Sequence, residues 1–238
     1  MHNDNKHSSI ISSLTHRLSA ALRCLLLALP ILLAASCSDN PRGAEAMAQA
    51  QQVISENPDS ALAILRSVSS EADGFPNSQR MAYYLLLADA KNKAYADMSA
   101  DSIMHEVADY YETWGDSNEK MRAKYLLGCV YRDRGDSPTA LRYYNDAVHC
   151  ADTTASDCDY GILAALYGQM SELYRKNNLA VYTKEMALKA VDASLKNCDT
   201  LNALSCAGDV AYAYNQMESL LLSRPRDKLQ KLRLHKSF

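Results

Sequence analysis

Apolar residues recur three and four positions apart along most of this chain, with polar residues between them. The stretch "LLGCVYRDRGDSPTALRYY", residues 126–144, shows this spacing on both sides of the polar block "GDSP". Such spacing places apolar side chains on one face of an α-helix, whereas alternation with a period of two, which is typical of strands, is nearly absent. The pattern therefore predicts an all-α protein built from amphipathic helices.

The block "GDSP" is interpreted as a joint between two helices. Gly135 supplies a left-handed residue that ends the first helix, and Ser137 caps the second helix with Pro138 in its first turn. The tripeptide returns at residues 115–117, where Asp116 and Glu119 form a capping box. A catalytic role for Ser137 is not favoured, because a serine nucleophile needs a strained turn and a base in reach.

The helical segments repeat. "NPDSALAILRSV" and "GDSPTALRYYNDAV" each contain a cap, an Ala, an apolar residue four positions later and another three positions beyond. The same slots are predicted in "ADSIMHEVADYY". In chain order, the three sets are Ala61, Leu65 and Val68; Ile103, Val107 and Tyr110; and Ala140, Tyr144 and Ala147.

Four helix pairs follow from these repeats, and a fifth first helix follows the fourth pair. The predicted starts lie near Ala44, Arg80, Lys120, Tyr160 and Asn202. The spacing between the later units stays open, because Tyr131 and Tyr174 are 43 residues apart, whereas Gly128, Gly168 and Gly208 recur every 40. "YRDRG" returns as "YRKNN", where an Asn stands at the position that favours a left-handed residue.

One unit resembles the tetratricopeptide repeat (TPR), a helix-turn-helix of about 34 residues. The resemblance rests on Leu127, Gly128 and Tyr131 of the first helix and on Ala140, Tyr144 and Ala147 of the second. Lys124 and Asp152 depart from the pattern, which has Trp and Pro there. Small residues let two helices approach and large ones fill the space beside them. The resemblance implies a TPR-like α-solenoid of about four helix pairs over residues 37–218.

Residues 1–36 are interpreted as a signal peptide, because a weakly basic leader precedes the apolar run "LLLALPILLAASC". "LAASC", residues 33–37, resembles the lipobox of bacterial lipoproteins. The resemblance implies lipidation of Cys37 and anchoring in the envelope of a Gram-negative cell. Ser38 suits sorting to the outer membrane. The alternative is an uncleaved helix that spans the membrane.

Residues 219–238 differ in charge from the repeats. From Leu220 onward there are six Lys or Arg and one acid, Asp227, whereas residues 37–218 contain 16 basic and 26 acidic residues. We interpret this basic tail as disordered or as the result of truncation of a longer chain. An arm for nucleic acid or anionic lipid is the less favoured alternative.

No cofactor, metal site or enzymatic activity is predicted. The chain has no Cys-x-x-Cys, no pair of His at metal-ligand spacing, no phosphate-binding loop and no nucleophile with a base. A disulfide between Cys150 and Cys158 stays open.

The resemblance implies a peptide groove lined by the first helices. The residues implied to face it are Arg122, Tyr125, Cys129, Arg132, Asp133, Glu172, Arg175 and Lys176. The alternative is that these charges solvate a helix face. The favoured function is a non-catalytic, lipid-anchored scaffold with a protein or peptide partner.

Two other functions fit parts of the sequence. One is the truncated sensor half of a longer TPR-containing regulator, against which the lipobox argues. The other is a glycan-binding outer-membrane lipoprotein, for which Trp114 is the clearest exposed aromatic candidate. The 15 tyrosines fit helical core spacing better than a sugar platform.

Overall fold

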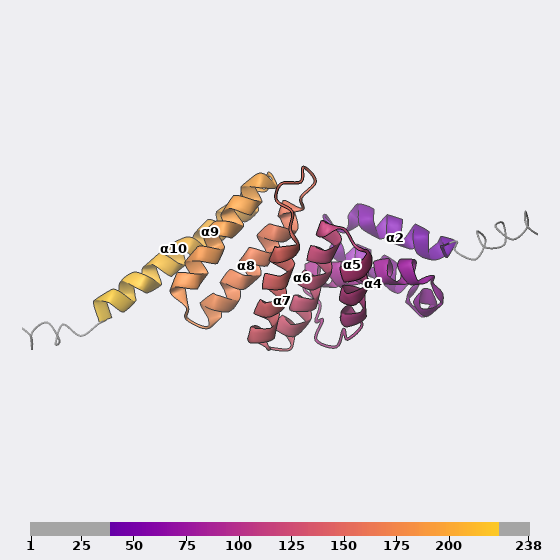
Figure 1. The fold of residues 1–238 in the computed structure, drawn as a ribbon, viewed down its shortest axis with the longest axis horizontal. Coiled ribbons are helices and arrows are strands. Elements are labelled where there is room, and N and C mark those ends of the chain that lie inside the picture. The colour runs from indigo at the N-terminus through magenta and orange to yellow at the C-terminus, as the bar shows by residue number, and fades with distance from the viewer. Residues whose placement is uncertain (1–38, 224–238) are drawn as a thin grey trace, which may run out of the picture.

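The computed structural model describes residues 39–223, and all regular elements in this range are helices (Figure 1). The predicted signal peptide and the predicted lipidation site Cys37 lie outside the described residues, as does the basic tail from residue 224. The elements are α2 (Pro41–Val53), α3 (Pro58–Arg66), η1 (Ser69–Gly74), α4 (Asn77–Lys93), α5 (Met104–Trp114), α6 (Ser117–Asp133), α7 (Ser137–Cys150), α8 (Tyr160–Lys176), α9 (Ala180–Lys196) and α10 (Thr200–Ser223).

The described helices form four consecutive pairs, α2–α3, α4–α5, α6–α7 and α8–α9, followed by the single helix α10. The pairs follow one another in chain order from α2 to α10 (Figure 1). The predicted all-α solenoid is confirmed. Helix α10 continues to Ser223, past residue 218, where the repeat domain was predicted to end.

Several first helices begin slightly earlier than predicted, at Pro41, Asn77, Ser117 and Thr200. The first turn of these helices is mostly polar, so the apolar pattern begins only after the helix itself has begun. Helix α8 begins at Tyr160, as predicted.

The joint between α6 and α7 has the predicted left-handed residue but a different cap. Gly135 has φ +77°. The N-cap is Asp136, whose carboxylate accepts the N–H of Thr139 at 3.1 Å. The prediction that Ser137 is the cap is wrong, because Ser137 is already the first helical residue. The capping box of Asp116 and Glu119 is confirmed, with both hydrogen bonds present at the start of α6.

Four helices of the described range, α4, α6, α8 and α9, have a residue with positive φ two positions after their last residue. These residues are Tyr95, Gly135, Asn178 and Cys198. In each case the next N–H bonds back to a carbonyl five residues earlier, as Ala96 does to Lys91. This closes the orphan carbonyls at the helix end. Asn178 was predicted to take this conformation and does. Tyr95 and Cys198 are unusual there, because side chains with a Cβ pay a steric cost in it.

The small residues predicted to permit close helix approach do so. Gly128 of α6 faces Tyr144 of α7, and a Cβ at Gly128 would lie 2.5 Å from the Tyr144 ring. In the next pair, Ser171 of α8 donates its hydroxyl to the carbonyl of Thr183 at 3.2 Å, and both side chains are fully buried. Ser171 therefore takes the place of Gly128, which settles the spacing of these two units at 43 residues.

The third set of repeat slots is corrected by one residue. Val107 is fully buried, as predicted, but Ile103 and Tyr110 are only partly buried. Met104, Ala108 and Tyr111 are buried at the same relative spacing as Ala140, Tyr144 and Ala147. The register was predicted wrongly because α5 has no side-chain cap from which its positions could be counted. A long connection from α4, residues 94–103, also precedes this helix.

Candidate functional site

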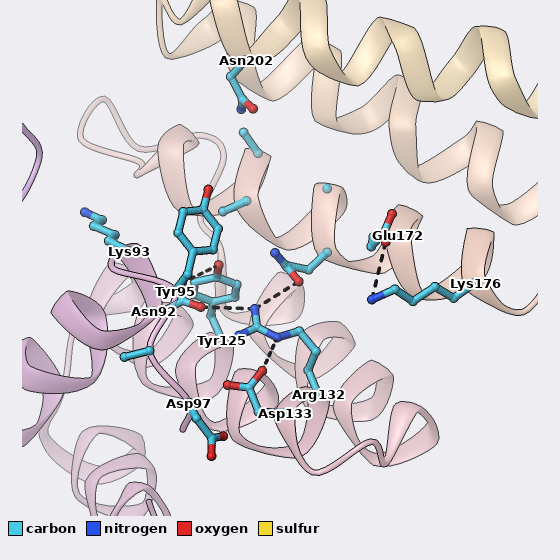
Figure 2. Close-up of a pocket in the computed structure, with 15 residues that line it drawn as sticks. Asn92, Lys93, Tyr95, Asp97, Tyr125, Arg132, Asp133, Glu172, Lys176 and Asn202 are labelled. Carbon is cyan, nitrogen blue, oxygen red and sulfur yellow. Dashed lines mark hydrogen bonds and ion pairs between the residues drawn. The ribbon is translucent and has the colours of Figure 1, made fainter. Parts of the chain in front are cut away.

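Two linked hollows run across the face formed by the first helices of successive pairs. One has a volume of about 810 Å³ and the other about 690 Å³. They share the lining residues Asn92, Lys93, Tyr125 and Ala165, so they form one depression, here called the groove. Helices α4, α6 and α8 supply most of its walls, and α10 contributes Asn202 (Figure 2).

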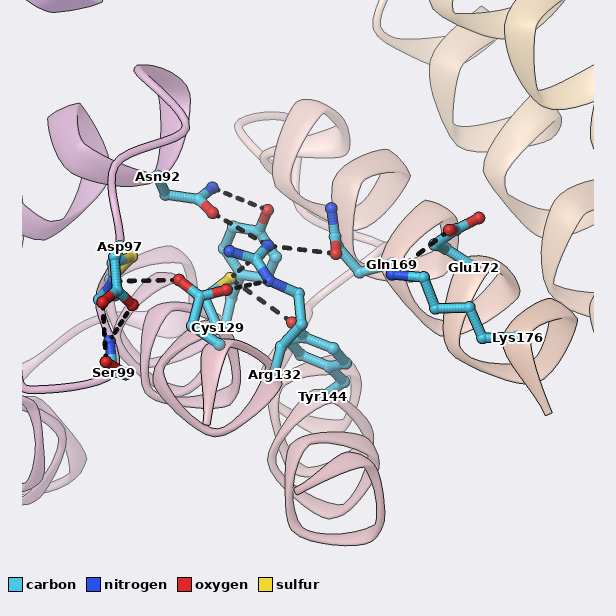
Figure 3. Close-up of polar contacts among 12 residues, drawn as sticks. Asn92, Asp97, Ser99, Cys129, Arg132, Tyr144, Gln169, Glu172 and Lys176 are labelled. Carbon is cyan, nitrogen blue, oxygen red and sulfur yellow. Dashed lines mark hydrogen bonds and ion pairs between the residues drawn. The ribbon is translucent and has the colours of Figure 1, made fainter. Parts of the chain in front are cut away.

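Arg132 ties three first helices together in the groove (Figure 3). Its Nη1 donates to Asn92 Oδ1 of α4 at 3.2 Å and to Gln169 Oε1 of α8 at 3.1 Å. Its Nε donates to Asp133 Oδ1 at 2.7 Å, and Asp133 Oδ2 accepts the N–H of Met98 at 3.0 Å. A guanidinium can serve several acceptors at once because its donors diverge in a plane. Arg132 therefore fixes the wall of the groove as well as facing it.

The floor beneath Arg132 is buried and uncharged. Tyr125 accepts the side-chain N–H of Asn92 at 3.1 Å. Cys129 was implied to face the groove, but it is fully buried and accepts the Tyr144 hydroxyl at 3.5 Å. Burial raises the pKa of the Cys129 thiol to about 11. Cys129 is thus a packing residue with a neutral thiol, and its implied role in contacting a ligand is wrong.

Arg122 lies at the centre of a second polar network, which links α4, α6 and the start of α8. Its guanidinium contacts Asp159 at 3.0 Å and Asp89 at 3.5 Å. Asp89 also pairs with Lys93 at 3.5 Å. Asp159 is the N-cap of α8, so the network fixes the α8 N-terminus relative to α6.

The three implied groove residues of α8 do not share one environment. Glu172 and Lys176 line the larger hollow and pair with each other at 3.5 Å. Arg175 pairs with Glu172, but its guanidinium lies over the ring of Tyr212 on α10, 5.5 Å from the centroid. Arg175 therefore bridges two helices and is absent from the lining of the groove.

Several groove residues were not foreseen. They are Asn92, Tyr95, Asp97, Gln169 and Asn202. Asn92 stands 40 residues before Arg132, as α4 does before α6, so the repeat spacing carried a signal for it. Tyr95 had no such signal. Its side chain is 97% exposed at the end of α4, beside the groove (Figure 2).

Within residues 39–223, no group of three or more His, Cys, Asp or Glu side chains is placed to hold a metal ion. The half-buried Cys150 and Cys158 are free thiols, and Cys150 accepts from the ammonium of Lys124 at 3.3 Å. No helix in the described range has the length and apolarity that a membrane span requires.

Comparison with known proteins gives a structural likeness. No family model and no curated protein matches the chain. A crystal structure of a protein described as a kinesin light chain of Podosopora anserina, with nearly identical TPR-like repeats, aligns over 81% of this chain and 94% of that one. The identity is 15% and the TM-score 0.52. A variant of the same protein aligns with 16% identity and a TM-score of 0.53, over 80% of this chain and 92% of that one. The chain thus has the fold of TPR-like repeat proteins.

Proposed function

We propose that the protein is a non-catalytic scaffold that binds a segment of another protein in the groove and is held in the cell envelope by a lipid on Cys37. The observation that carries the first part is the continuity of the two hollows across α4, α6 and α8. A depression that crosses successive helix pairs suits an extended chain better than a compact small molecule.

The polar groups of the groove support a peptide ligand. Gln169 and Asn202 line the groove with side-chain amides, a group that can hydrogen-bond to a peptide backbone. The Asn92 amide already donates to Tyr125 and accepts from Arg132, and Gln169 Oε1 also accepts from Arg132, so the Gln169 Nε2 is the donor directed to a ligand. Side chains of both charges line the groove. Lys93 and Lys176 are positively charged, and Asp97 and Glu172 are negatively charged. Such a mixture does not resemble the uniformly basic surface that nucleic acid requires.

Gly168 of α8 leaves open space in the groove. Gly168 lies near the middle of α8, and the space beside its α-carbon is open, because a Cβ there would meet no atom within 4 Å. A larger side chain at this position would therefore point into solvent within the groove without disturbing the packing of α8. This makes Gly168 a suitable place to block the groove.

Site-specific photocrosslinking in the native envelope tests the groove. A photoreactive phenylalanine replaces Tyr95 in one variant and Trp114 in another, since both side chains are largely exposed but only Tyr95 lines the groove. We expect a defined protein adduct from position 95 and none from position 114. The adduct should disappear when Gly168→Trp is added, and the captured protein, once purified, should bind the unmodified chain but not the Gly168→Trp variant.

Two results would contradict the proposal. Equal capture at both positions would indicate nonspecific contact. An adduct at position 95 that survives Gly168→Trp would place the partner outside the groove. Folding of the Gly168→Trp variant is checked by its helical circular dichroism, so that loss of the adduct cannot reflect unfolding.

The lipid anchor is proposed from "LAASC" at residues 33–37. Several acyl chains on one cysteine would hold the protein firmly, because each buried methylene adds about 0.8 kcal/mol. An alkyne fatty acid fed to the cells should label the protein and the label should vanish in Cys37→Ser. Labelling that persists in Cys37→Ser would exclude this residue as the anchor. Sorting to the outer membrane is tested separately by density fractionation of the two membranes.

A further inference from the structure

Helix α10 carries the positions that receive a second helix, but no described helix covers them. Ala211 and Tyr214 stand 40 residues after Ser171 and Tyr174, matching the spacing from α8 to α10. Ser171 is fully buried against α9, and the Tyr174 ring packs against Tyr182 with centroids 5.3 Å apart. On α10 the equivalent side chains are exposed.

The uncovered surface is apolar. It consists of Leu204, Ala207, Ala211 and Tyr214, hereafter the α10 face, and Leu204 and Tyr214 are 73% and 54% exposed. Nine of the eleven large apolar side chains that are exposed in the described range lie between Leu179 and Tyr214. Two of these nine side chains, Leu204 and Tyr214, lie on the α10 face, whereas Tyr212 lies against Arg175 of α8. Exposed apolar side chains that share one face mark an interaction surface.

The α10 face has an order that suits pairing with itself. Its two small residues lie in the middle and its two large residues lie at the ends, symmetrically about position 209. If two copies of α10 pack antiparallel about a two-fold axis at this position, Ala207 of each copy opposes Ala211 of the other, and Leu204 opposes Tyr214. Small residues in the centre allow the helices to approach closely, and a two-fold interface uses the same patch on both copies.

Charge also favours a second copy as the occupant. Between Thr200 and Met217 the only Asp, Glu, Lys, Arg or His is Asp209, which is half-buried on the opposite side of the helix. Lys184 of α9 lies over the Tyr214 ring, 5.1 Å from its centroid, at the edge of the face. Two copies can therefore meet without bringing like charges together at the centre. We propose that the α10 face binds the α10 face of a second copy, so that the protein is an antiparallel dimer. This inference does not depend on the function proposed for the groove.

Sedimentation equilibrium of the 238-residue chain in density-matched detergent micelles tests the dimer. We expect a mass twice the 26.3 kDa of the monomer. Ala211→Arg should give the monomer mass, because it places two guanidinium groups at the centre of the interface. Ala63→Arg on α3, an exposed position far along the chain, is the matched control and should stay dimeric.

The orientation is tested by thiol crosslinking. A mixture of the Ala207→Cys and Ala211→Cys variants should give a crosslinked dimer that exceeds what either variant or the unmodified chain gives alone, because the two positions face each other across the axis. A monomeric unmodified chain would overturn the proposal and would mean that the face is free or is covered by residues after Ser219. A dimer that persists in Ala211→Arg would overturn it in favour of another interface.

Discussion

Gly128 of α6 packs directly against the ring of Tyr144 of α7, and a Cβ added at Gly128 would lie 2.5 Å from that ring. Tyr144 is fully buried and its hydroxyl donates to Cys129, so the ring cannot easily move aside. The glycine is therefore a packing requirement of this helix pair.

The first prediction contrasts two glycines in the middle of helices. Gly128→Ala should lower the free energy of unfolding by about 2 kcal/mol, because overpacking of a filled core forces side chains and backbone to shift. Gly168→Ala should raise it by about 1 kcal/mol, because its site is open and Ala is the better helix former. Urea denaturation measures both. If the two variants shift stability in the same direction, the packing described here is incorrect.

A second prediction concerns the left-handed residues that end α4 and α6. Tyr95→Asn should stabilise the fold by about 0.5–1 kcal/mol, since Asn tolerates positive φ and the exposed tyrosine loses little packing. Gly135→Ala should lower the free energy of unfolding by about 1 kcal/mol, because a side chain with a Cβ is strained at the positive φ of this residue. Thermal unfolding of the two variants gives the comparison. If Tyr95 contacts the partner, Tyr95→Asn should also weaken binding while it stabilises the protein, and a gain in both properties would argue against that contact.

The third prediction tests the network of Arg132. Arg132→Leu should reduce the free energy of unfolding by about 2–3 kcal/mol, because hydrogen bonds to a charged group are lost and Asp133 loses its cation. Arg132→Lys should recover only part of this, since an ammonium cannot reproduce the fork of a guanidinium. Arg175→Lys is the control and should change stability by less than about 1 kcal/mol, because its ion pair with Glu172 is partly exposed. Chemical denaturation of all three variants decides the ranking.

The fourth prediction concerns pH. Burial raises the pKa of Cys129 to about 11 from an ordinary value of 9.0, so the folded state binds this proton more tightly than the unfolded state does. The resulting stability is present below pH 9 and is lost as the pH rises from 9 to 11. Cys129→Ala should make the decline of the free energy of unfolding over this range shallower. An identical decline in both proteins would show that the thiol is not buried as described.

Thiol alkylation provides an independent check on Cys129. At about pH 8, iodoacetamide should modify the exposed Cys198 and leave Cys129 unmodified until the protein unfolds, because the reactive species is the thiolate and burial also blocks access. Mass spectrometry of the digested protein identifies the modified residues.

Most of the fold could be predicted from local sequence signals. The apolar spacing, Gly135, and the capping box of Asp116 and Glu119 each act within a few residues, and each is present in the structure. Where a local signal was weak, as before α5, the register was misassigned by one residue. Tyr95 and Cys198 show the same limit, because their left-handed backbone follows from the bonds that close a helix end and not from any preference of their own.

The sequence by itself determined the all-α class, the order in which the helices pair and the small residues where two helices cross. These features depend on residues one or two helical turns apart in the chain. Tertiary structure decided which charged residues line the groove. Arg132 and Arg175 stand at equivalent repeat positions, yet Arg132 joins Asn92 and Gln169 in the groove while Arg175 lies against Tyr212. Their environments differ because each depends on the side chains of adjacent helix pairs, about 40 residues away in sequence, and the periodicity of one helix contains no information about them.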